Sequence, residues 1–131
     1  MIEENGLSRT IKVIQSRKDA DKSKSYVASL LQGGEERILK KLTEETTELI
    51  LAVNSQQKSE MVHEAADLLF HYLVLLEKVN ISLEDVIDEL LSREGVSGFQ
   101  EKRERKVDRK TDLHFPVKNF VDTSSEARDF D

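Results

Sequence analysis

The sequence predicts an all-α protein, an antiparallel bundle of about four main helices. Long charged side chains together with Leu, Ile and Ala favour helices, and charged residues alone make up 35% of the chain. Only one proline, Pro116, occurs in 131 residues. Apolar residues recur at spacings of three and four along several segments, as on one face of a helix. A chain of this length is expected to form one domain with its own core.

The first part of the chain contains two short helical segments. Apolar residues at a helical spacing predict an amphipathic helix over residues 7–16. The polar stretch 17–25 is expected to be a loop, and residues 26–31 a short helical turn. Gly33 and Gly34 then end that turn, because glycine breaks helices more often than it forms a phosphate-binding loop.

Two long helices are predicted next, over residues 35–53 and 60–79, with the polar connector 54–59 between them. The second of these helices is apolar on nearly all sides after Ala65, which is typical of a central helix that packs against several neighbours. Its apolar surface exceeds what a small monomeric bundle buries. We therefore expect a homodimer in which the following stripe packs against its own copy: Leu69, Leu73 and Leu76, beside Tyr72 and Val79.

A fourth helix is predicted to start after Ser82. Ser82 suits the N-cap position with Asp85 three residues later, and Ile81 is placed to pack against Val86. Its expected buried face consists of Leu83, Val86, Ile87, Leu90 and Leu91. The domain is assigned to residues 1–105, and residues 106–131, with dense mixed charge, to a mobile or loosely docked tail.

Composition excludes several classes of protein. A net charge of −6 argues against a nucleic-acid or anionic-membrane binder, and no apolar run is long enough to span a bilayer. The absence of cysteine rules out disulfides and thiolate metal sites, and three dispersed histidines do not suggest zinc. The acidic N-terminus lacks the apolar segment of a secretion signal. We therefore expect a cytoplasmic protein.

Four carboxylates interrupt the apolar rows of the two long helices. Glu45 and Glu48 lie three residues apart on the first helix, and Glu64 and Asp67 three apart on the second. Side chains with this spacing share a helix face, so antiparallel packing would bring the two pairs together. Buried carboxylates need cations, and neither row contains a basic residue. Oxygen ligands suit Mg²⁺, with Mn²⁺ as a substitute.

Further charged residues surround this expected metal site. Glu44 lies beside the same face and is a candidate further ligand, or the base that orients a water. Arg37, Lys40 and Lys41 lie one to two turns away, where basic side chains would bind a polyphosphate. The alternative is an ordinary solvated helix face, which fits Glu44 and Glu48 alone but not Asp67 among apolar neighbours. The histidines His63, His71 and His114 are not expected to be ligands.

Beyond the acids, four segments of the chain resemble a known family. The two acid pairs on consecutive helices are similar to the all-α nucleoside-triphosphate pyrophosphohydrolases, a superfamily that includes MazG-like enzymes and dimeric dUTPases. Residues flanking the acids resemble phosphoribosyl-ATP pyrophosphatases of histidine biosynthesis more specifically. The similar segments are 25–31, 37–48, 64–76 and 93–102, within a likeness that covers residues 7–105.

The resemblance implies Mg²⁺-dependent hydrolysis of phosphoribosyl-ATP, a small-molecule nucleotide, to phosphoribosyl-AMP and pyrophosphate. Metal ligation then falls to the four acids, and water activation to Glu44 and Glu48. Ser25, Tyr26 and Arg93 become candidates for substrate contact across a dimer, in addition to the basic cluster. Two alternatives stay open at this point: a house-cleaning nucleoside-triphosphate pyrophosphatase with the same metal site, and a non-catalytic helical dimerisation module.

Overall fold

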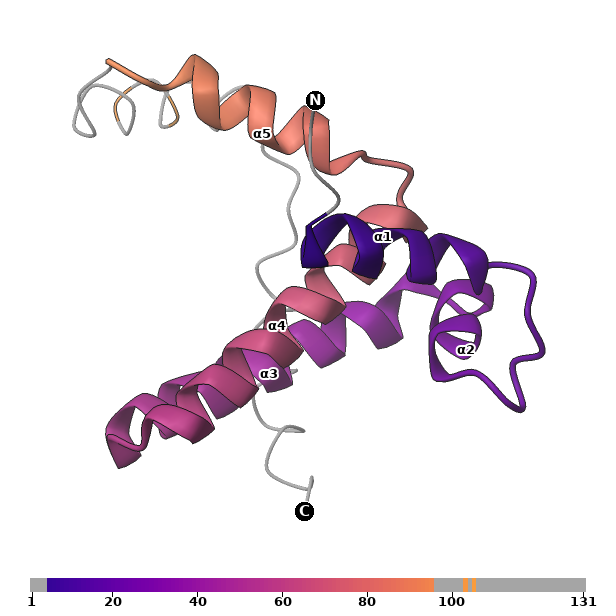
Figure 1. Ribbon diagram of the computed structural model, residues 1–131, viewed down its shortest axis with the longest axis horizontal. Helices are drawn as coiled ribbons and strands as arrows, with labels where there is room; N and C mark the ends of the chain where they lie inside the picture. The colour runs from indigo at the N-terminus through magenta and orange to yellow at the C-terminus, as the bar shows by residue number, and fades with distance from the viewer. Residues whose placement is uncertain (1–4, 96–102, 104, 106–131) are drawn as a thin grey trace. The chain divides into compact units, whose positions relative to one another are not determined.

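The computed structural model describes residues 5–95, 103 and 105 of the chain, and these residues form helices without any strand (Figure 1). The all-α fold class predicted from the sequence is confirmed. The predicted tail, residues 106–131, lies outside the described residues. The helices are α1 (Gly6–Ser16), α2 (Tyr26–Gln32), α3 (Glu35–Ser55), α4 (Lys58–Lys78) and α5 (Leu83–Ser92).

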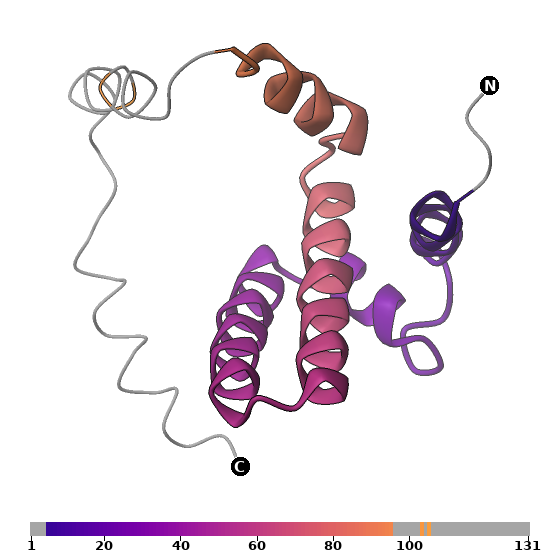
Figure 2. The same cartoon turned by 60° about the vertical axis from the view of Figure 1, so that its left-hand side comes forward.

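The chain divides after Val86 into two units, so helices α1 to α4 belong to the first unit and most of α5 to the second. Within the first unit, α3 and α4 form an antiparallel hairpin, and the two helices lie side by side over most of their length (Figure 2). This pairing is the arrangement that brings the two predicted acid pairs face to face.

The turn between α3 and α4 is shorter than the predicted connector 54–59. Helix α3 continues to Ser55 and α4 begins at Lys58, because Gln56 adopts a left-handed conformation with φ 60° that reverses the chain at once. Side chains then tie the turn together: the Ser55 hydroxyl lies 2.9 Å from a carboxylate oxygen of Glu60. A tight turn fixes the register of α4 against α3, and therefore the position of one acid pair against the other.

Helix α4 is the central element, as its all-round apolar sequence predicts. Helices α1, α2 and α3 all pack against it. The core of the unit contains side chains from all four helices: Ile14, Val27, Leu30, Leu31, Ile38, Leu73 and Val74. None of the described helices is both long enough and apolar enough to cross a membrane.

The short helix α2 is held at both ends. Ser25 caps its N-terminus by accepting a hydrogen bond from the Ala28 amide at 3.2 Å. At the other end the Lys78 ammonium of α4 donates to the Leu31 carbonyl at 2.8 Å. Gly33 ends the helix as predicted, and a Cβ there would lie only 3.1 Å from the Ser29 carbonyl oxygen. Residues at the start of α2 are therefore placed firmly beside α4.

One prediction about an apolar face is wrong. Leu73 and Leu76, assigned to a dimer stripe, are buried within the single chain, because α4 turns that side toward its own α1, α2 and α3. The Ser82 cap of α5 is confirmed by a 3.2 Å hydrogen bond from the Asp85 amide, but no residue of α5 is buried. The predicted buried face of α5 stays a prediction: Leu83 packs against the core of the first unit, and Ile87, Leu90 and Leu91 are exposed in the single chain.

Candidate functional site

The α3–α4 hairpin brings the predicted acids together. One carboxylate oxygen from each of Glu45, Glu48 and Glu64 can be chosen so that all lie within 4.8 Å of one another. Glu45 and Glu48 come from successive turns of α3, and Glu64 from the facing side of α4. The spacing of three thus presents both Glu45 and Glu48 to Glu64 on the opposite helix, whereas Asp67 is not part of this group.

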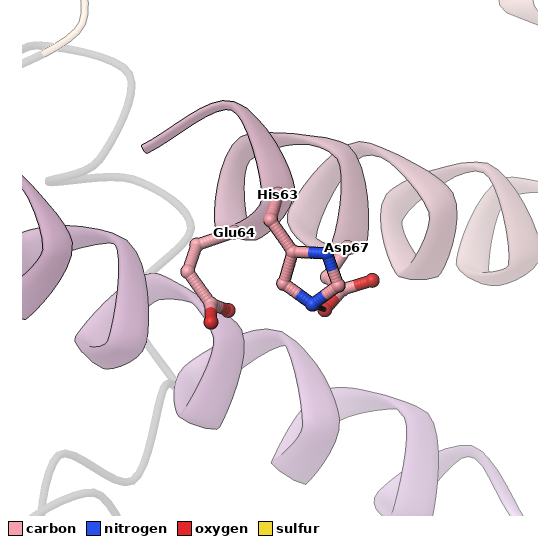
Figure 3. Close-up of side chains that lie close together, drawn as sticks. All are labelled: His63, Glu64 and Asp67. Carbon is pink, nitrogen blue, oxygen red and sulfur yellow. Dashed lines mark ion pairs between the residues drawn. The ribbon is translucent and has the colours of Figure 1, made fainter. Parts of the chain in front are cut away.

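A second group on α4 overlaps the first. His63, Glu64 and Asp67 also offer ligand atoms within 4.8 Å of one another, with Glu64 common to both groups (Figure 3). His63 Nε2 lies 3.4 Å from Asp67 Oδ2, an ion pair whenever the imidazole is protonated. His63, which is not expected to be a ligand from the sequence, therefore lies within ligand distance of Glu64 and Asp67. The sequence did contain a signal, the spacing of four between His63 and Asp67 on one helix.

Burial differs strongly among the four acids. Glu45 is the most buried, with 7% of its surface exposed, whereas the Asp67 side chain retains 40%. Asp67 is thus less enclosed than its apolar neighbours in the sequence suggested, because Ala65, Ala66 and Leu69 beside it are themselves exposed. The buried centre of the cluster lies at Glu45, against α4.

The electrostatics of the cluster are unfavourable without a cation. Burial raises the pKa of Glu45 from 4.5 to about 7, helped by a hydrogen bond shared with Glu48 and by the charges of Glu48, Asp67 and Glu64. The pKa of Glu64 is raised as well, first through its hydrogen bond with Glu48. One buried oxygen of Glu45 and one of Glu64 have no hydrogen-bond partner. Uncompensated oxygens of this kind are what a hard divalent cation binds.

The residues therefore fit a magnesium or manganese ion. Two unpartnered buried oxygens belong to facing helices, and the donors around them are carboxylates, with one imidazole at the edge. Mg²⁺ prefers carboxylate oxygens and keeps several waters, while Mn²⁺ also accepts imidazole. The observation that carries this fit is the pair of orphaned oxygens rather than the number of acids, since exposed acidic groups are common on helices.

Glu44 and the basic residues flank this cluster without entering it. The Glu44 carboxylate pairs with Lys41 Nζ at 3.1 Å and belongs to neither ligand group. This contact raises the pKa of Lys41, which stays cationic. Arg37 is exposed, and its guanidinium lies 5.9 Å from the centre of the Tyr26 ring. Lys40 is exposed on the same helix.

The three weaker candidates for substrate contact have different positions. The Ser25 hydroxyl is occupied as the N-cap of α2, so its contact in the described chain is structural. Arg93 belongs to the second unit and pairs with Glu89 at 3.1 Å. Tyr26 lies at the start of α2, where Lys41, Arg37, Glu45 and Glu44 all act electrostatically on its hydroxyl. Of the three, Tyr26 is the one that the structure brings to the cluster.

Comparison with known proteins agrees with this geometry. The family model described as phosphoribosyl-ATP pyrophosphohydrolase matches residues 7–94. A phosphoribosyl-ATP pyrophosphatase of Nitrosospira multiformis is 50% identical over 101 residues, covering 77% of this chain and 84% of that protein. A protein of the same name from Janthinobacterium sp. is 47% identical, covering 78% and 96%, and one from Geobacter metallireducens is 48% identical, covering 76% and 91%. The chain belongs to the phosphoribosyl-ATP pyrophosphohydrolase family.

Proposed function

We propose that this protein hydrolyses phosphoribosyl-ATP to phosphoribosyl-AMP and pyrophosphate, a step of histidine biosynthesis that would take place in the cytoplasm. The observation that carries the proposal is the carboxylate cluster between α3 and α4, with Glu45 buried at its centre and basic side chains beside it. A triphosphate is the kind of ligand that needs both parts. The names of the relatives supply the identity of the nucleotide.

Glu45, Glu48, Glu64 and Asp67 are the residues that would hold Mg²⁺, or Mn²⁺ in its place, with His63 at the edge of the site. A bound divalent ion neutralises phosphate oxygens and makes water a better nucleophile. A bound ion would also offset the repulsion between Glu45 and the neighbouring carboxylates, so that the cluster can stay buried at low cost.

The chain's own residues then bind the substrate and handle the proton. Arg37, Lys40 and Lys41 offer cationic groups to the outer phosphates and to the pyrophosphate that leaves. The attacking water adds its oxygen to one phosphorus while the bond to pyrophosphate breaks, and Glu44 or Glu48 accepts the proton. Glu44 lies outside both ligand groups, so its carboxylate is available for this role, and Lys41 at 3.1 Å orients it.

Two isosteric changes test the role of the acids. Glu48→Gln and Asp67→Asn each remove one charge from a ligand group and should reduce turnover of phosphoribosyl-ATP by at least about a hundredfold. Circular dichroism spectra should keep their helical form, because both side chains are partly exposed. Asp88→Asn, on the exposed surface of α5, is a matched control and should retain full turnover. Normal turnover in either cluster variant contradicts the assignment.

We further propose that two copies of the chain associate and complete the helical bundle. Six large apolar side chains of the α3–α4 hairpin remain exposed: Leu39, Ile50, Leu51, Val53, Val62 and Leu69. Exposed apolar surface on this scale is typical of an interface. Light scattering should give twice the mass of 15.0 kDa, and Leu51→Glu should shift the mass toward the monomer. A monomeric parent chain contradicts the proposal.

A further inference from the structure

A buried histidine connects the metal-binding turn of α4 to the start of α2. His71 follows Asp67 by one helical turn and is 6% exposed. Its Nδ1 lies 2.8 Å from the backbone carbonyl oxygen of Asp67, and its Nε2 lies 2.8 Å from the Tyr26 hydroxyl oxygen. Both ring nitrogens of this side chain therefore have partners, although neither partner is a metal.

For a neutral imidazole, the contacts set the direction of both hydrogen bonds. The Asp67 carbonyl can only accept, so Nδ1 carries the hydrogen of the neutral ring and donates it. Nε2 is then an acceptor, and the Tyr26 hydroxyl donates to it. The Tyr26 oxygen keeps its lone pairs for other donors. This assignment follows from the network of polar contacts.

Aromatic packing holds the imidazole in place. The Phe70 ring meets His71 edge-on at 5.4 Å between centroids, and the Tyr26 ring does so at 5.8 Å. Edge-to-face contacts of this kind restrict ring rotation. His71 is therefore a rigid support for Tyr26, which is 44% exposed.

Tyr26 in turn faces the charged residues of α3. The Arg37 guanidinium lies 5.9 Å from the centre of its ring, a distance at which a cation is attracted to the aromatic face. Arg37 Nη1 is also 3.3 Å from the hydroxyl oxygen of Ser29, one turn along α2. Burial raises the pKa of Tyr26, and the charges of Lys41 and Arg37 act in the opposite direction.

We propose that His71 is a positioning residue that holds Tyr26 as a support for Arg37, so that this polyphosphate-binding cation stays in register with the Asp67 turn. This inference rests on the proposed function, because it assigns a role within the same site. It predicts that the Tyr26–His71 bond affects binding of the polyphosphate more than the chemical step.

The structure offers variants that separate the two bonds of His71. The amide of Asn reaches the position of Nδ1, so His71→Asn keeps a donor for the Asp67 carbonyl and loses the bond to Tyr26. Gln reaches the position of Nε2, so His71→Gln keeps an acceptor for Tyr26. Tyr26→Phe removes the hydroxyl from the same bond and leaves the ring beneath Arg37. Tyr72→Phe, next to His71 and packed against the core, is the matched control.

The experiment measures KM and kcat for phosphoribosyl-ATP, and by calorimetry the Kd of inorganic tripolyphosphate in Mg²⁺. Tyr26→Phe and His71→Asn should each raise KM and Kd about five- to tenfold, the loss of one hydrogen bond, with kcat changed by less than about threefold. The Kd of the double variant should be no higher than that of the more weakly binding single variant, because both changes remove the same hydrogen bond. His71→Gln and Tyr72→Phe should stay within about twofold of the parent.

Several results overturn the inference. If the fold-changes in Kd of the two single variants multiply in the double variant, the two residues act separately. Unchanged KM and Kd, with only a lower urea midpoint, would mean that His71 is merely a core residue. A parent chain that binds tripolyphosphate but leaves phosphoribosyl-ATP intact would disprove the proposed function, while the Kd series would still decide the role of His71. A parent that binds no tripolyphosphate would overturn both.

Discussion

Replacing Glu45 by Gln tests whether the buried Glu45 carboxylate, when ionised, destabilises the metal-free protein. The pKa of Glu45 is about 7 in the folded chain against 4.5 for an ordinary glutamate. Between these pH values the folded chain holds a proton that the unfolded chain has released. The free energy of unfolding therefore falls as the pH rises through this window. Below the window Glu45 is protonated in both states and contributes nothing.

The size of the effect follows from the shift. Each pKa unit corresponds to about 1.4 kcal/mol, so raising the pKa of Glu45 from 4.5 to about 7 costs the metal-free chain about 3 kcal/mol of stability above the window. The Gln side chain has the same shape and no charge at any pH. We expect Glu45→Gln to match the parent at about pH 4.5 and to be more stable by about 2–3 kcal/mol at about pH 8.

The assay is urea unfolding in EDTA at four pH values across this range. Glu36→Gln is the matched control, because Glu36 is an exposed acid in the first turn of the same helix. Loss of that favourable dipole contact should lower stability by up to about 1 kcal/mol, the opposite sign. If the free energies of unfolding of Glu45→Gln and the parent change in parallel as the pH rises, then ionisation of Glu45 does not destabilise the folded chain and the prediction is refuted.

Three other predictions follow from the same geometry. In scanning calorimetry at about pH 8, millimolar Mg²⁺ should raise the melting temperature of the parent by several degrees and that of Glu45→Gln much less. The reason is that the cation binds only the folded cluster, and equal shifts in the two proteins would contradict this. His63→Gln should weaken Mn²⁺ binding about tenfold and Mg²⁺ binding less than twofold in titration calorimetry, since imidazole suits the softer ion. Unchanged binding of Mn²⁺ would exclude His63 as a ligand. Ser82→Ala should cost about 1 kcal/mol in urea unfolding through loss of the α5 cap, and no change would show that the cap is dispensable.

Much of the hairpin could be predicted from the sequence because its signals are local. The row that contains Ile38, Glu45 and Ala52 is buried along α3, as the spacing of three and four indicated. The break at Gly33 and the cap at Ser82 were also read correctly, because capping depends on a few adjacent residues. The convergence of Glu45 and Glu48 with Glu64 followed from these helices and from a short antiparallel turn.

Other features depend on information that is not local. Helix α4 is apolar on nearly all sides, so its sequence does not indicate which side faces the chain's own core, and Leu73 was assigned to the wrong side. The early turn at Gln56 could not be foreseen, because glutamine has no special preference for a left-handed conformation. The bond between His71 and Tyr26 joins residues 45 positions apart in the chain, and only the packing of α2 on α4 reveals it.

The most direct test of the central claim is a pyrophosphate-release assay with Mg²⁺ that compares phosphoribosyl-ATP with ATP, dUTP and a modified nucleoside triphosphate. The acids contact a triphosphate that all four compounds share, so the comparison tests the nucleotide itself. We predict that phosphoribosyl-ATP is preferred by at least about a hundredfold in kcat/KM and yields one pyrophosphate and one phosphoribosyl-AMP per turnover. A preference for dUTP or the modified nucleotide would contradict the account and favour a house-cleaning pyrophosphatase, and release of no pyrophosphate from any of them would exclude an enzyme of this class.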